Sequence, residues 1–307
     1  MSENRTSRSL AGFISAVSAF LIWGLSPIFY KSLRHVPPFE ILMHRMVWSF
    51  LFLLPVLILL KRWKSFVRVF RYRKAMSMLF GTTLLVACNW FVYIWAINNN
   101  HILQASLGYY INPLVNVMLA MLFLRERLRR LQIVAVLLAL AGVLYLTFSI
   151  GQFPWVALTL AFTFAFYGLL RKTAPVEALE GLSIETLLLF IPAAGYLFYL
   201  DRQGAGAFFN IHWHTDLLLM ASALITAIPL LLFTTGARSL TFVTIGFLQY
   251  LAPSCNFLLA VFVYGEPFST AQAVTFCVIW TALAIFSVDA VMVWKSTTVR
   301  ALRNVSA

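Results

Sequence analysis

Apolar residues in this chain form ten long runs, and the short connections between them hold most of the charged residues. A helix needs about 20 mostly apolar residues to cross the hydrocarbon core of a bilayer. The pattern therefore predicts an all-α integral membrane protein with ten transmembrane helices. The predicted helices occupy residues 9–32, 38–60, 75–98, 102–124, 128–149, 153–171, 181–200, 215–237, 242–264 and 270–294.

Part of the fourth run recurs in the ninth, at an offset of 140 residues between 105–127 and 244–267. The offset matches residue types that are uncommon in membrane helices, so chance similarity explains it poorly. The matched pairs are Tyr110 with Tyr250, Pro113 with Pro253, Asn116 with Asn256, Leu119 with Leu259, Ala120 with Ala260, and Glu126 with Glu266. We interpret the match as an internal duplication, with a first repeat over residues 1–150 and a second over 151–307.

The basic residues predict how the helices are oriented. Most of the 23 Lys and Arg residues lie in connections on one side, among them 61–74 and 125–130. Cytoplasmic connections are enriched in Lys and Arg, so both termini are predicted to face the cytoplasm. Each repeat holds five predicted helices, an odd number, so the second repeat begins on the opposite side. The two repeats are therefore predicted to be inverted relative to each other.

Composition and missing motifs exclude several classes of protein. The chain is 62% hydrophobic and 11% charged, whereas soluble domains are about 45–50% apolar and about 25% charged. The net charge of +13 does not indicate nucleic-acid binding, because the basic residues lie in short clusters between apolar runs. Walker A, GxSxG, HExxH and paired-cysteine patterns are missing, so the sequence predicts no cofactor, no metal site and no enzyme.

Two prolines lie inside matching helices. Pro113 and Pro253 each free a backbone carbonyl one turn earlier and are predicted to kink their helices. A kink can serve packing alone, or it can line a cavity together with nearby amide side chains. Those amides, candidate substrate-binding residues, are Asn112, Asn116, Gln249 and Asn256. Amides in a membrane need partners, so in either case they are expected to face the interior of the bundle.

Aromatic residues mark the same helices. Some of them are expected simply to form the belt at the membrane surface. The deeper ones are candidates for contact with a substrate, together with one neighbouring amide. These candidates are Trp23, Asn89, Trp90, Tyr93, Tyr109, Tyr110, Tyr167 and Tyr250.

Three ionisable residues lie inside predicted helices. His44 is one turn from Glu40, so the simpler interpretation is that these two residues are partners. Arg45 needs a partner or a water-filled cavity at its depth in the membrane. The 140-residue offset matches Arg45 with Glu185, and we hypothesise a charge pair between them. Glu185 is also the candidate for a proton-carrying carboxylate, although a buried, paired glutamate can be purely structural.

Several longer motifs give the chain a family resemblance. They are FLIWGLSP at 20–27, HRMVWS at 44–49, NWFVYIWAINN at 89–99, ASLGYYINPLVN at 105–116 and FYGLLRK at 166–172. With the five-plus-five layout, they resemble the drug/metabolite transporter superfamily, and within it the RarD branch of the EamA family. The resemblance covers nearly the whole chain.

The resemblance implies a carrier in the bacterial inner membrane that moves amino acids, metabolites or drug-like compounds. It also implies a cavity between helices 1, 3, 4 and helices 6, 8, 9. The leading interpretation is thus a secondary transporter driven by a proton gradient or by exchange. A passive channel and a scaffold or receptor subunit are the alternatives. The expected partners are a small-molecule substrate and membrane lipid, and Gly108, Ala120 and Ala260 would allow close packing within the molecule or in a homodimer.

Overall fold

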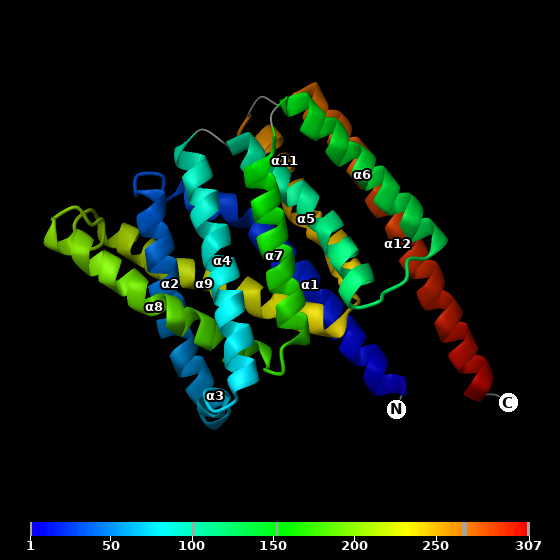
Figure 1. Ribbon diagram of the computed structural model, residues 1–307, viewed down its shortest axis with the longest axis horizontal. Helices are drawn as coiled ribbons and strands as arrows, with labels where there is room; N and C mark the ends of the chain where they lie inside the picture. The colour runs from blue at the N-terminus through cyan, green and yellow to red at the C-terminus, as the bar shows by residue number, and fades with distance from the viewer. Residues whose placement is uncertain (1, 100–101, 152, 266–268, 306–307) are drawn as a thin grey trace.

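The computed structural model describes residues 2–99, 102–151, 153–265 and 269–305, and these residues form helices and no strand (Figure 1). Glu266, matched with Glu126 in the predicted repeat, lies outside them. The helices are α1 (Ser2–Lys31), α2 (Pro38–Leu59), α3 (Trp63–Val69), α4 (Arg73–Asn98), α5 (Ile102–Phe123), α6 (Arg130–Ile150), α7 (Trp155–Thr173), α8 (Ala178–Arg202), α9 (Trp213–Ser239), α10 (Phe242–Gln249), α11 (Leu251–Leu258) and α12 (Thr270–Val305).

In the part of the chain described, nine helical spans are long and apolar enough to cross a membrane. All the runs predicted from the sequence are helical. However, α7, predicted at 153–171, is not among the nine spans. Arg171 and Lys172 lie in its last turn and shorten its apolar stretch. The total of ten transmembrane helices therefore stays a prediction.

The two predicted helices with matched prolines differ from each other. Helix α5 continues through Pro113 without interruption. The ninth predicted run is instead divided at Tyr250 into α10 and α11, followed by a π-helical turn over Leu259–Val263. The division lies one turn before Pro253, where the missing proline N–H leaves a carbonyl without its helical partner.

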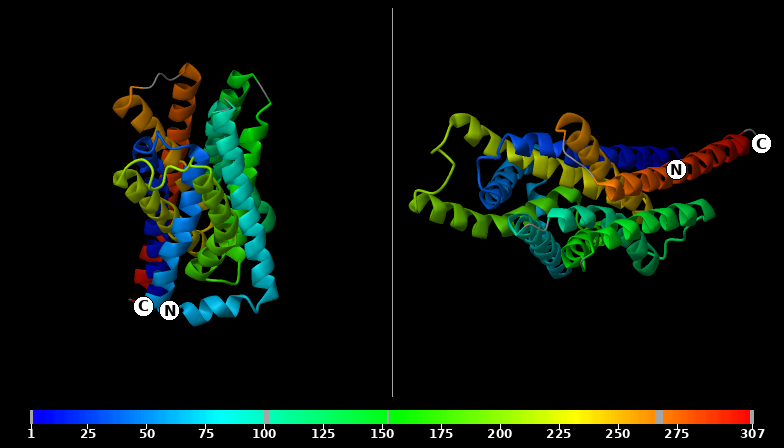
Figure 2. Two further views of the ribbon diagram at one scale, coloured as in Figure 1. Left: turned by 90° about the vertical axis from the view of Figure 1, so that its left-hand side faces the viewer. Right: turned by 90° about the horizontal axis from the view of Figure 1, so that it is seen from above.

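The helices pack in two layers, with α1, α2 and α9–α12 in one and α4–α8 in the other (Figure 2). Helix α1 contacts α9 and α11, while α7 contacts α4 and α5. Helices α2 and α8, α5 and α10, and α6 and α12 also contact each other. If each helix is replaced by its counterpart in the other predicted repeat, the same set of contacts results; for example, α1 with α9 becomes α7 with α4. Two copies related by a two-fold axis produce such a pattern, although the inverted repeats and the division at residue 150 stay predictions.

Close helix contacts depend on small residues. A Cβ atom added to Gly236 of α9 would lie 2.8 Å from the Ala16 Cβ of α1, and one added to Gly24 of α1 would lie 2.6 Å from the Cys255 Cβ of α11. Both distances are shorter than van der Waals contact, so larger side chains there would force the helices apart.

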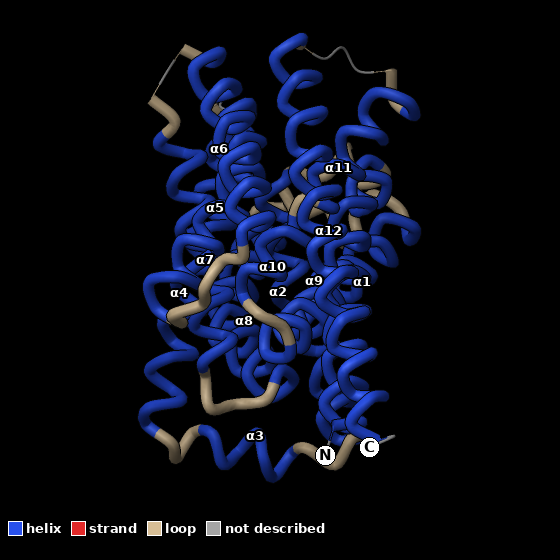
Figure 3. Tube along the Cα trace, turned by 90° about the vertical axis from the view of Figure 1, so that its right-hand side faces the viewer, coloured by secondary structure: helices blue, strands red, loops and turns tan. Residues whose placement is uncertain are grey.

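Both termini lie at the same end of the bundle as α3, which runs across that end (Figures 1 and 3). Phe66 and Val69 of α3 are buried, while Lys64 and Arg68 are exposed. With one buried apolar face and one exposed basic face, α3 has the pattern of an amphipathic helix at a membrane surface. We call this end the basic end. The α1–α2 connection (residues 32–37) lies at the other end of α1.

Candidate functional site

A cavity of about 750 Å³ lies between the two layers, lined by residues from α1, α2, α4, α5, α7, α9, α10 and α11. Its volume is typical of sites for small organic ligands, which range over about 300–1,000 Å³. The structure brings most of the predicted site residues to this cavity. They are Trp23, Arg45, Asn89, Trp90, Tyr93, Tyr109, Asn112, Gln249, Pro253 and Asn256.

The cavity reaches the protein surface at the end opposite the basic end. Lys31 and Arg34, at the end of α1 and in the α1–α2 connection, line it there and are exposed. The Lys31 Nζ lies 3.2 Å from the centroid of the Tyr264 ring. Two cations therefore flank the opening.

Arg45 lies deeper in the cavity and is half-buried. Its Nε donates a hydrogen bond of 2.9 Å to the Thr226 Oγ1 of α9. Its guanidinium carbon lies 5.2 Å from the centroid of the Trp90 ring and 5.4 Å from that of Tyr30. The hydrogen bond holds the guanidinium at its Nε, and the two aromatic rings lie close to it. Aromatic rings attract cations, so this position favours the charged side chain.

The predicted pair between Arg45 and Glu185 is wrong in this structure. Helices α2 and α8 do contact each other. Arg45, however, is bonded to α9 at the cavity, whereas Glu185 is bonded to α4 and α7. Matching sequence positions in two repeats need not touch, because two-fold symmetry gives each of them equivalent neighbours rather than each other.

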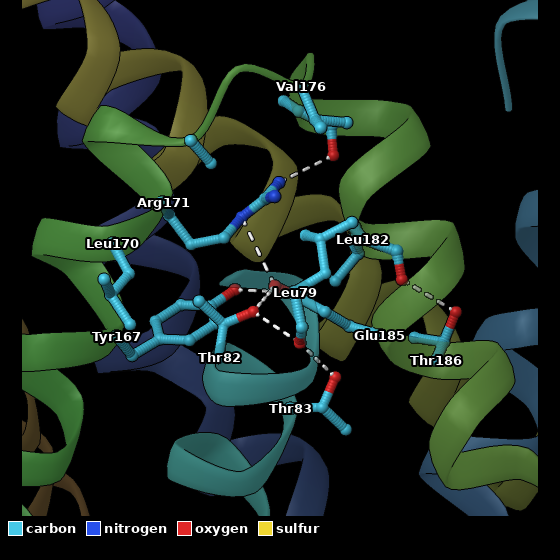
Figure 4. A network of polar contacts seen from close by, with 12 residues as sticks. Leu79, Thr82, Thr83, Tyr167, Leu170, Arg171, Val176, Leu182, Glu185 and Thr186 are labelled. Atoms are coloured by element: carbon cyan, nitrogen blue, oxygen red, sulfur yellow. Dashed lines mark hydrogen bonds and ion pairs between the residues drawn. The ribbon is translucent and has the colours of Figure 1, made fainter. Parts of the chain in front are cut away.

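Glu185 is instead the centre of a buried polar network (Figure 4). Its Oε1 accepts a hydrogen bond of 2.5 Å from the Thr82 hydroxyl and lies 3.5 Å from the Arg171 Nε. Its Oε2 accepts a 3.3 Å hydrogen bond from the Tyr167 hydroxyl. Arg171 is fully buried and also donates to the Ala178 carbonyl. A buried cation and two donating hydroxyl groups thus surround the Glu185 carboxylate.

Arg171 was not among the predicted site residues, because an arginine near the end of an apolar helix resembles a topological signal. Its position in the FYGLLRK motif, four residues after Tyr167, was the available clue, since the two side chains lie on one helical face.

Most of the predicted amides are held by hydrogen bonds within the protein. Asn89 donates to the Leu160 carbonyl and the Thr163 hydroxyl, both at 2.9 Å. Asn116 donates to the Gln249 Oε1 at 2.7 Å, joining α5 to α10. These bonds make all three amides parts of the helix packing, while Asn89 and Gln249 are also parts of the cavity wall.

Two buried polar atoms that belong to cavity-lining residues have no hydrogen-bond partner in the described part of the chain. They are the hydroxyl of Tyr30 and the Oδ1 of Asn256. Buried polar atoms normally have a partner, so each of them is available to a bound ligand or to water.

Below the cavity, aromatic side chains fill the centre of the bundle. Phe20, Trp23 and Phe164 line the cavity floor, and all three contact the Phe233 ring, with centroids 5.4–6.0 Å apart. Tyr167 lies beneath Phe164, with centroids 5.7 Å apart, and its hydroxyl reaches the Glu185 network. The aromatic layer therefore separates the cavity from that network.

The basic end is also closed by polar contacts. The Glu126 carboxylate accepts hydrogen bonds from the Phe242 and Val243 N–H groups, at 2.7 and 3.0 Å, at the first turn of α10. Lys172 donates to the Ala237 and Leu240 carbonyls between α9 and α10. A carboxylate at a helix N-terminus and an ammonium at a helix C-terminus both have favourable electrostatics.

The remaining predicted residues lie away from the cavity. Tyr110 packs on Phe276 of α12, and its carbonyl accepts a bond of 3.2 Å from the Tyr250 hydroxyl. Asn116, Tyr167 and Pro113 are also outside the lining.

His44 lies at the α8–α9 connection. Its Nε2 is 3.8 Å from the Glu40 Oε1, which also accepts a 2.6 Å hydrogen bond from the Ala207 N–H. His44 thus lies beside Glu40, the partner named in the simpler interpretation, although Glu40 is buried. A purely structural role for His44 stays a prediction.

Comparison with known proteins is consistent with this architecture. A model described as the EamA-like transporter family matches residues 10–148. An uncharacterized transporter of Vibrio cholerae is 49% identical over 278 residues, 91% of this chain and 92% of the relative. Protein RarD of Escherichia coli K12 is 44% identical over 286 residues, 93% and 97% of the two chains. A solved crystal structure, 20% identical, has a TM-score of 0.70 over 91% of this chain and 96% of its own, which concerns the fold alone.

Proposed function

Because this chain belongs to the EamA-like transporter family, among its RarD proteins, we propose that it is a secondary active transporter of small organic solutes that works by alternating access. It is a multi-pass protein of the bacterial inner membrane. The observation that carries the proposal is a ligand-sized cavity that opens toward one end of the bundle and has a packed aromatic floor toward the other. A solute in such a cavity has access to one side of the membrane at a time.

The proposed topology has ten transmembrane helices in two inverted repeats, with both termini in the cytoplasm. The equivalent contacts made by matched helices of the two repeats support this topology. The basic residues at the end with α3 and both termini support a cytoplasmic position for that end. In this orientation the cavity opens outward.

Inverted repeats provide a direct route to the opposite state, in which each repeat takes the conformation of the other. Arg45 and Glu185 occupy equivalent positions in the two repeats. Arg45 lines the outward cavity, while Glu185 lies below the aromatic floor. In the inward-facing state, Glu185 would line the cavity on the cytoplasmic side. We propose that this exposure lets its carboxylate exchange a proton and couple transport to the proton gradient.

The test is counterflow in proteoliposomes loaded with a mixed pool of amino acids, organic acids and antibiotics, with and without an imposed pH gradient. We expect saturable exchange that is faster when a pH gradient is imposed. In Glu185→Gln, exchange should remain but should no longer respond to the gradient. Lys64→Gln, an exposed change on α3, is the matched control. Non-saturable flux without counterflow would support a channel instead. Saturable exchange indifferent to pH and to Glu185→Gln would leave the carrier but reject the proton role.

A further inference from the structure

The charged side chains that line the cavity are all basic. Lys31, Arg34 and Arg45 contribute to the wall, and none of its described lining residues is Asp or Glu. Lys31 and Arg34 are exposed at the opening, whereas Arg45 lies deeper, against the Tyr30 and Trp90 rings. Water screens the charge of Arg45 less than it screens a charge on an open surface. The part of the described wall around Arg45 therefore favours anions.

Arg45 has donors left for a ligand. Its Nε is bonded to Thr226. Among the described residues no ion pair involves Arg45, and its two terminal nitrogens donate no hydrogen bond to any other described residue. A guanidinium presents its donors in a planar fork, which matches the two oxygens of a carboxylate. The Tyr30 hydroxyl is a buried donor with no hydrogen-bond partner among the described residues, and its side chain lies against this guanidinium.

The rest of the cavity suits an apolar or aromatic body. Trp23, Trp90 and Phe164 form part of the wall and floor. The unpartnered Oδ1 of Asn256 offers one acceptor for a hydroxyl or amide on the same ligand. The ammonium of an amino acid would find no acidic partner among the described residues of this wall, so a simple acid fits better than a zwitterion.

We propose that the cavity binds small organic acids, with the carboxylate on Arg45 and an aromatic or aliphatic body against Trp23, Trp90 and Phe164. This inference names the substrate class of the transporter and rests on the proposed function. Transport selectivity would then follow from the charge of the solute rather than from its apolar part.

The first test measures binding by titration calorimetry to the purified full chain in nanodiscs of zwitterionic phosphatidylcholine. The probes share a phenylpropyl body and differ in charge: 3-phenylpropionate, 3-phenylpropanamide, 3-phenylpropylamine and phenylalanine. The acid should bind about tenfold or more tightly than the amide or the amine, because a charge-assisted hydrogen bond is lost with either. Phenylalanine should be weaker than the acid. Equal affinity of acid and amide would overturn the proposal.

The second test locates the anion. Arg45→Gln should weaken binding of 3-phenylpropionate by about tenfold and leave the amide unchanged. The difference in affinity between acid and amide should be partly retained in Arg45→Lys and fully retained in Lys64→Gln. An equal loss in Arg34→Gln, at the opening, would assign the effect to the general field and overturn the role of Arg45. If Arg45→Gln does not fold, the comparison of acid with amide on the native chain still decides the proposal.

Two further measurements separate this inference from others. Loss of 3-phenylpropionate binding in nanodiscs that contain phosphatidylglycerol would indicate that lipid head groups occupy the site, contrary to the proposal. In the counterflow assay, exchange of neutral or cationic solutes without any binding of acids would reject the substrate class and retain the carrier. Binding of the acid without exchange would retain the anion site and reject the transport function.

Discussion

The Arg171–Glu185 ion pair provides a sharp test of how this bundle is held together. Replacing Arg171 with Met removes the cation and leaves the Glu185 carboxylate buried. Both side chains are nearly inaccessible, at 0% and 2% exposed, and their nearest charged atoms lie 3.5 Å apart. At an effective dielectric constant of about 20, such a pair attracts by about 5 kcal/mol before the cost of desolvation.

The expected loss is smaller than this gross attraction. Breaking a buried pair by removing one partner typically costs about 3–5 kcal/mol. The Thr82 and Tyr167 hydroxyls still donate to the Glu185 carboxylate in the variant, so part of its stabilisation remains. We therefore expect Arg171→Met to lower the free energy of unfolding by about 3 kcal/mol, near the lower limit for such changes.

A double-mutant cycle isolates the pair from other effects. Glu185→Gln keeps an oxygen acceptor for the two hydroxyls and removes the charge. The double variant Arg171→Met/Glu185→Gln leaves no unpaired charge, so it should recover about 2 kcal/mol relative to the sum of the two single changes. Lys64→Met, on the exposed face of α3, is the control and should stay within about 0.5 kcal/mol of the native protein.

The assay is reversible unfolding in mixed micelles of dodecyl maltoside and increasing sodium dodecyl sulfate, followed by helical circular dichroism. Arg171→Met should unfold at a clearly lower mole fraction of dodecyl sulfate than the control. An Arg171→Met protein as stable as the control, or a double variant no better than the sum of its parts, would refute the reasoning that this ion pair stabilises the bundle.

Three other changes test contacts elsewhere. Glu126→Gln weakens the carboxylate cap on α10, so hydrogen exchange of the first α10 amides should accelerate by about tenfold, with unchanged exchange there refuting the cap. Gly236→Leu should destabilise the α1–α9 contact by about 1–3 kcal/mol in the unfolding assay, while Gly195→Leu, which meets nothing within 4 Å, should not. Asn116→Leu leaves the Gln249 oxygen without its donor and should cost about 1–3 kcal/mol, and no loss would indicate that water replaces the amide.

The candidate site could be predicted in kind but not in detail. The offset repeat and the polar residues inside apolar runs led to Arg45, Asn89, Trp90 and Asn256, all of which line the cavity. Composition alone did not separate these from Tyr110 and Tyr250, which are bonded to each other outside the lining. The sequence pattern around the lining residues and around these two tyrosines is similar. They differ in whether the helical face that carries them points toward the cavity, which the sequence does not reveal.

Partners across helices were beyond sequence reasoning. The 140-residue offset paired Arg45 with Glu185, whereas the folded chain pairs Glu185 with Arg171. A one-dimensional match relates equivalent positions, but an ion pair depends on the rotation and tilt of each helix.

The sequence by itself determined the membrane setting, the run of apolar helices and the basic clusters at one end. These features follow from local hydropathy and charge, which the chain carries residue by residue. Only the tertiary structure decided where α10 and α11 divide, that the cavity opens away from the basic end, and that the charged residues of its described wall are all cationic. Those features arise from side chains far apart in sequence, because packing selects which face of each helix meets its neighbours.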